Sequence, residues 1–105
     1  MLEQYFYVLP WIARAHDAER LALAAIAGLE DAGRPATDWI ERAGDAAVAL
    51  GDHARGRERY EQALRARPNA PHLLLKLSDL QFLMGDAEGE RAFRERIYGS
   101  LLGRP

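Results

Sequence analysis

Residues 49–70 read "ALGDHARGRERYEQALRARPNA", and the breaks in this stretch decide the fold. A helical pattern stops at Gly51-Asp52, restarts, passes through Tyr60 and stops again at Pro68-Asn69. Glycine ends a helix at low cost because it adopts left-handed backbone readily, and an aspartate can accept hydrogen bonds from the free N–H groups of the next helix. The stretch therefore predicts two antiparallel helices joined by a tight turn at Gly51-Asp52, with a second turn at Pro68-Asn69 after them.

The same signals recur along the chain at nearly one period. Asp52 and Asp86 each follow a glycine and stand 34 residues apart, and His16-Asp17 precedes Asp52 by 35 residues. A period of this length is typical of proteins built from stacked helical hairpins. Together with the apolar spacing, it predicts six helices at about 2–15, 17–31, 38–50, 53–66, 71–84 and 87–101.

Composition narrows the class of protein. The chain has 105 residues, of which 49% are hydrophobic and 29% charged, and its formal net charge is −2. These values predict one folded domain without a strong field for nucleic acid or anionic membranes. The absence of cysteine excludes disulfides and thiolate chemistry. The N-terminus lacks the basic region of a signal peptide and a stretch long enough to span a bilayer, so we expect a cytoplasmic location.

In its recurring turn signals and apolar spacing, the chain resembles the tetratricopeptide repeat family, whose period is 34 residues. The best match covers residues 37–70 and comprises Ile40, Ala43-Gly44, Gly51-Asp52, Gly56, Tyr60, Ala63-Leu64 and Pro68-Asn69. Residues 71–104 form a second copy and residues 2–36 a weaker first one. The resemblance implies an all-α array of three hairpins in one domain over residues 1–105, an α-solenoid with a concave groove for peptides or helices. It implies no catalytic chemistry.

The first helix of each hairpin would line such a groove. By helical phase, we expect it to present Asp38, Glu41, Asp45, Val48, His72, Leu75, Asp79, Phe82 and Leu83. Four carboxylates beside apolar side chains would favour a ligand with Lys or Arg next to hydrophobic anchors. The alternative is that these acids form only a solvated helix face.

The N-terminal stretch "MLEQYFYVLPWIARA" is apolar around the whole helix rather than along one stripe. Such a helix is normally buried on all sides, so we expect a second surface to cover it. The residues of this self-association or partner surface are Tyr5, Phe6, Tyr7, Val8, Trp11 and Ile12. The alternative is that the last helix or Trp39 folds back over it.

Other functions have little support in the sequence. The arginines of residues 55–67 alternate with Glu58 and Glu61 at spacings that favour local ion pairs, so we do not expect nucleic acid as a partner. The three histidines show no metal-binding spacing, and no nucleophile motif or phosphate loop occurs, so we expect neither an enzyme nor a cofactor. We therefore predict a protein-interaction scaffold. The alternative is a structural domain that self-associates through the N-terminal helix.

Overall fold

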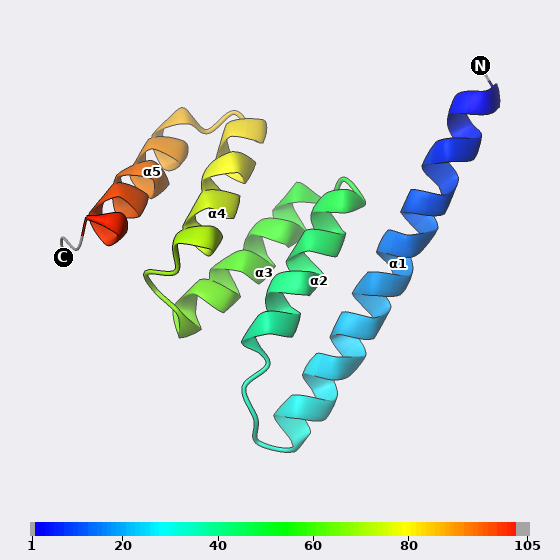
Figure 1. The fold of residues 1–105 in the computed structure, drawn as a ribbon, viewed down its shortest axis with the longest axis horizontal. Helices are drawn as coiled ribbons and strands as arrows, with labels where there is room; N and C mark the ends of the chain where they lie inside the picture. Colours follow the sequence, from blue (N-terminus) through cyan, green and yellow to red (C-terminus); the bar gives the residue numbers. More distant parts are fainter. Residues whose placement is uncertain (1, 103–105) are drawn as a thin grey trace.

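The chain folds into five helices that follow one another in space as they do in sequence (Figure 1). The structure is a computed structural model that describes the backbone of residues 2–102 and the side chains of residues 12–99 and Leu102. The helices are α1 (Leu2–Asp31), α2 (Thr37–Ala49), α3 (His53–Ala66), α4 (Pro71–Leu83) and α5 (Ala87–Leu101). Within the described residues there is no strand, so the all-α prediction is confirmed.

The first predicted hairpin is replaced by one long helix. We expected a turn at His16-Asp17, but α1 runs unbroken over 30 residues, so the prediction of six helices is wrong. The other two turns contain a glycine with positive φ, whereas Ala15 precedes His16 and favours helix instead. Asp17 pairs with Arg20 on the same helix, at 3.7 Å, rather than beginning a new one.

The two later turns form as predicted. Gly51 and Gly85 have φ values of 85° and 80°, which are left-handed and therefore favour glycine. Asp52 Oδ1 accepts a hydrogen bond from the Arg55 backbone N–H at 3.1 Å, and this cap starts α3. Asp86 caps α5 in the same way through the Gly89 N–H, at 2.9 Å. Residues 37–66 and 71–101 thus form two helical hairpins, as the sequence predicts.

Small residues let α2 and α3 approach closely. A Cβ atom added to Gly44 would lie 2.7 Å from the Tyr60 ring, and one added to Gly56 would lie 2.5 Å from Val48. Neither position has room for a larger side chain. The close packing of α2 on α3 therefore depends on these two glycines.

The core runs along the row of helices instead of filling one central space. Its most deeply buried large side chains are Leu73, Leu74 and Leu77 of α4. Tyr60 of α3 and Ile26 of α1 belong to the same apolar cluster, which links all the helices through α4 and the half-buried Phe93 of α5. Each helix packs mainly on its neighbours in sequence.

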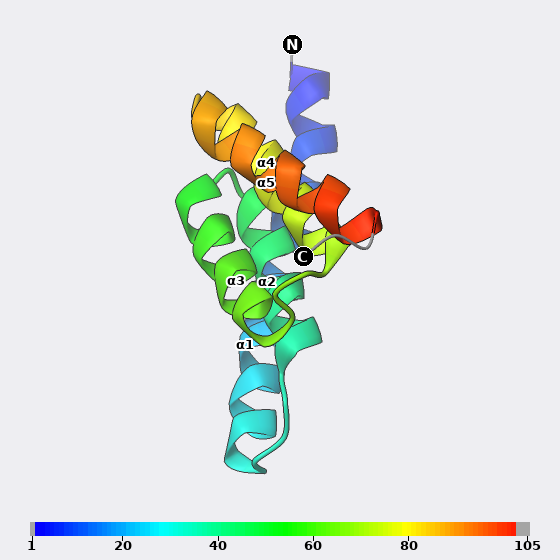
Figure 2. The same cartoon turned by 90° about the vertical axis from the view of Figure 1, so that its left-hand side faces the viewer.

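The molecule is flat and extended. Its dimensions are 50 × 41 × 19 Å and its radius of gyration is 15.6 Å, against about 13 Å for a compact domain of this length. Seen from the side, α4 and α5 are tilted against α2 and α3, and the N-terminal end of α1 projects beyond the other helices (Figure 2). The arrangement is not a closed bundle, because α1 and α5 lie at opposite edges (Figure 1).

An ion pair helps to hold the long first helix in place. Arg55 of α3 donates to both carboxylate oxygens of Glu19 on α1, at 3.0 and 3.1 Å. The sequence predicted only local partners for these arginines, and one such pair exists between Arg57 and Glu61 at 3.9 Å. Arg55 therefore connects two separate parts of the chain.

Candidate binding groove

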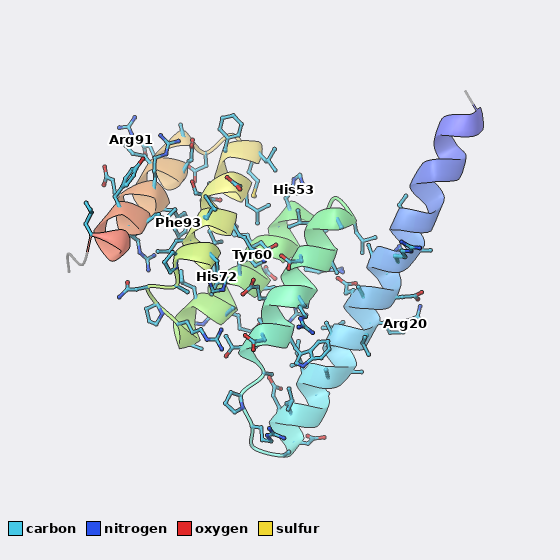
Figure 3. The ribbon with its side chains drawn as sticks, viewed as in Figure 1. Arg20, His53, Tyr60, His72, Arg91 and Phe93 are labelled. Atoms are coloured by element: carbon cyan, nitrogen blue, oxygen red, sulfur yellow. The ribbon has the colours of Figure 1, made fainter. Side chains whose placement is uncertain are left out.

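Several of the predicted groove residues meet where the two hairpins join. Lys76 Nζ of α4 donates to Glu41 Oε2 at 2.6 Å and to Asp45 Oδ1 at 2.9 Å, and both carboxylates lie on α2. His72 Nε2 lies 2.9 Å from the other oxygen of Glu41. The Tyr60 hydroxyl of α3 donates to Asp45 Oδ1 at 2.5 Å. We call these five side chains the inter-hairpin network, and its members Tyr60 and His72 are labelled in Figure 3.

The electrostatics of this network favour its charged, paired form. Burial acts to raise the pKa of the Glu41 carboxyl, but the hydrogen bonds and charges of Lys76 and His72 outweigh it and hold this pKa below its ordinary value. Burial acts to lower the pKa of Lys76, but its two carboxylate partners raise it overall. Burial and the bond to Asp45 strongly raise the pKa of the Tyr60 hydroxyl, which therefore stays a proton donor.

The pairing changes the expected charge of the groove. The predicted acidic surface relied on four carboxylates, and two of them, Glu41 and Asp45, are paired with Lys76. A third, Asp38, forms an ion pair with Arg67 at 2.9 Å, near the start of α2. Asp79 is exposed and makes no hydrogen bond or ion pair among the described residues. The expectation of a basic ligand therefore depends mainly on Asp79.

Beside the network lies a depression of about 260 Å³, which we call the α2–α4 groove. It is lined by Val48, Tyr60, Lys76, Asp79, Leu80 and Leu83. Three of these residues, Val48, Asp79 and Leu83, were predicted from the sequence. Leu75 and Phe82 do not line the depression, but both project from α4 with 54% and 68% of their surfaces exposed. Leu83 is 60% exposed, so this end of α4 presents a solvent-accessible apolar surface.

A larger depression, which sequence reasoning missed, lies between α1 and α2. This α1–α2 groove has a volume of about 480 Å³ and is lined by Arg14, Ala15, Ala18, Leu21, Trp39, Arg42, Asp45, Ala46 and Ala49. Its base consists largely of alanines, which leave space between the two helices. The Arg42 guanidinium lies over the Trp39 ring, 4.6 Å from its centre. Alanines at helical spacing on residues 15–18 and 46–49 could have indicated it, but only if α1 had been recognised as continuous.

The predicted self-association surface can be followed only in part. Ile12 is 38% exposed, whereas Tyr5, Phe6, Tyr7, Val8 and Trp11 lie outside the described side chains. The backbone of residues 2–11 belongs to α1 and continues past the end of α2 (Figure 1). Trp39 lines the α1–α2 groove, and α5 lies at the opposite edge of the molecule.

Among the described residues, no group of three His, Asp or Glu side chains could hold a metal ion. In that same part of the chain, no helix combines the length and hydrophobicity that a membrane span requires.

Comparison with protein-family models, with curated proteins and with solved structures found no significant match. The function is therefore inferred from the geometry of this chain.

Proposed function

We propose that the chain is a non-catalytic scaffold resembling tetratricopeptide repeats, which binds a helical or extended segment of another protein along the α2–α4 groove. The single observation that supports this most is the exposure of Leu75, Phe82 and Leu83 beside that groove. Apolar side chains clustered at the rim of a depression commonly anchor a partner. The cytoplasmic location expected from the sequence stays a prediction.

The repeat assignment is supported by the recurrence of structural details at the predicted period. Gly51 and Gly85 both turn the chain with left-handed backbone, and the aspartate after each caps the next helix. The second copy differs from the first in its packing. Gly56 lies against Val48 and Gly89 against Gln81, eight residues earlier on the preceding helix in both cases, but Gly89 also lies against the Asp86 side chain.

The inter-hairpin network gives the groove a fixed shape. Lys76 connects α4 to two carboxylates on α2, so the two helices that flank the groove are held in one relative position. A site that is already formed binds with a smaller entropy cost than one that must first be ordered. In this proposal Val48 and Leu83 contact apolar side chains of the ligand, Phe82 and Leu75 flank it, and Asp79 accepts a hydrogen bond or a positive charge.

The test begins with selection of peptides from a displayed random library against the purified chain. Binding of the selected peptides is then measured by calorimetry for wild type, Phe82→Glu and the control Tyr98→Glu. Tyr98 is an aromatic residue of α5 that is 59% exposed, so its replacement alters a surface outside the groove. We expect Phe82→Glu to weaken binding by a factor on the order of a hundred, while Tyr98→Glu binds as wild type does.

Circular dichroism must show equal helix content for the three proteins. Amide shift changes in an NMR titration should centre on Val48, Asp79 and Leu83. Equal affinity of the Phe82→Glu variant, or shift changes confined to another face, would show that the groove is not the binding site.

A further inference from the structure

Helix α1 forms one wall of the α1–α2 groove, and its N-terminal end projects beyond α2 (Figure 1). Within the part of the chain that the structure describes, the groove is an apolar surface without an occupant, and the projecting end is an apolar segment without a covering surface. The groove is an apolar depression between two helices with alanines at its base. Residues 2–11 form a helical segment that is rich in large apolar side chains and projects beyond α2 (Figure 1). This segment cannot enter the groove of its own chain, because it continues the straight helix that forms one wall of that groove.

We propose that residues 2–11 of a second copy of this chain occupy the α1–α2 groove, in an antiparallel two-fold dimer centred between Ile12 and Ala13 of α1. A two-fold operation that pairs residues 2–11 with residues 14–23 of the partner necessarily does the same in reverse. Both grooves are then filled and both projecting segments are covered in one closed assembly.

Helical spacing supplies a register for this pairing. Residues 4, 7, 11, 14, 18 and 21 alternate at intervals of three and four, which places them along one stripe of α1, and this is the spacing of a coiled-coil seam. Arg14, Ala18 and Leu21 of that stripe line the groove. In an antiparallel pair centred between residues 12 and 13, position 7 faces position 18 of the second copy, and position 11 faces position 14.

Two of the three facing pairs are complementary, one in size and one in chemistry. Tyr7 would face Ala18, so that a large side chain meets a small one. Trp11 would face Arg14, which is a pairing that a cation–π interaction stabilises. The remaining position pairs Gln4 with Leu21.

The charges of residues 2–11 and of the groove are compatible with this pairing. Residues 2–11 carry one acidic residue, Glu3, and no Lys or Arg. The groove is lined by two arginines, Arg14 and Arg42, and by one carboxylate, Asp45. Asp45 already accepts bonds from Lys76 and Tyr60, so its carboxylate does not require a positive charge on the bound segment. Glu3 would lie at the level of residue 22 of the other copy.

The first experiment measures the dimer dissociation constant by sedimentation for wild type, Ala18→Glu and Ala27→Glu. Ala18 and Ala27 are both exposed alanines of α1, and nine residues place them on opposite sides of the helix. We expect wild type to dimerise and Ala18→Glu to raise the dissociation constant on the order of a hundredfold, because it introduces a charge into an apolar interface. Ala27→Glu should behave as wild type.

The second experiment tests the register by cross-linking. The chain contains no cysteine, so a short bis-maleimide reagent links only introduced ones. A mixture of Tyr7→Cys and Ala18→Cys chains should give a cross-linked dimer that joins one of each. Neither variant should link to itself, and a chain carrying both cannot link internally, because the two positions are about 16 Å apart along one helix.

Three results would overturn the inference: a monomer at millimolar concentration, equal dissociation constants for the two glutamate variants, or a Tyr7→Cys chain that links to itself. The proposed peptide groove is independent of this dimer, since α4 takes no part in it. Failure of one proposal therefore leaves the other standing.

Discussion

The ammonium group of Lys76 lies 2.6 Å from Glu41 Oε2 and also contacts Asp45, so that one side chain of α4 joins two carboxylates of α2. Helices α2 and α4 are not consecutive in the sequence, because α3 lies between them. Lys76 also lies over the Tyr60 ring, 5.6 Å from its centre. One cation thus contacts both helices of the preceding hairpin.

Replacement of Lys76 should therefore weaken the junction between the hairpins. Lys76→Met keeps the apolar stem but removes the charge, which leaves Glu41, whose side chain is 16% exposed, without its main partner. We expect a loss of about 1–2 kcal/mol in the free energy of unfolding, measured by urea denaturation. The control is Arg20→Met, which breaks a pair with Asp17 inside α1 whose side chains are 81% and 74% exposed, and it should cost about 0.5 kcal/mol or less. Equal losses in the two variants would contradict the joining role of Lys76.

Stability should also depend on pH through Glu41. Its pKa is lower in the folded chain than the ordinary value of 4.5, so the unfolded chain takes up this proton at a higher pH. The stabilisation is therefore present above pH 4.5 and is lost as the pH falls through the lower pKa of the folded state. Glu41→Gln should be less stable than wild type by about 1 kcal/mol at pH 7, and this difference should shrink in acid.

Denaturation curves at a series of pH values test this expectation. Glu58→Gln is the control, because Glu58 is exposed and makes no hydrogen bond among the described residues. Its stability should stay within about 0.5 kcal/mol of wild type. If the Glu41→Gln difference is constant, or grows as the pH falls, Glu41 does not stabilise the fold as a carboxylate.

Replacement of two glycines by alanine should change the stability of the chain in opposite directions. Gly51 has a φ of 85°, so Gly51→Ala forces a side chain into left-handed backbone and should destabilise the chain by about 1–2 kcal/mol. Gly28 lies within α1, and a Cβ added there meets nothing within 4 Å. Gly28→Ala should therefore stabilise the chain by about 0.5–1 kcal/mol, because alanine favours helix. Thermal unfolding of both variants measures whether each change raises or lowers stability. A stabilising Gly51→Ala would contradict the left-handed backbone of this turn.

Local signals allowed much of the fold to be predicted. The turns at Gly51 and Gly85 and the caps at Asp52 and Asp86 form where the sequence indicates them, because each depends on a few adjacent residues. The break at His16-Asp17 was inferred only from the repeat period. No glycine supported it, and the intrinsic preference of the surrounding residues for helix prevailed.

The candidate site could be predicted less completely. Helical phase correctly assigned Phe82 and Leu83 to an exposed surface. It could not identify Lys76 as the partner of Glu41, since 35 residues separate them and their contact depends on how two hairpins are tilted. The α1–α2 groove was missed for a similar reason, because it exists only once α1 and α2 pack side by side.

The sequence by itself determined the helices that end in glycine and begin at aspartate, and the two hairpins that they form. Those features follow from backbone preferences and capping bonds within a few residues. Only the tertiary structure decided that α1 is continuous beside α2, that Lys76 pairs with Glu41 and Asp45 of α2, and that a groove lies on either side of that helix. These depend on the distances between helices, and packing sets such distances through residues that are far apart in the chain.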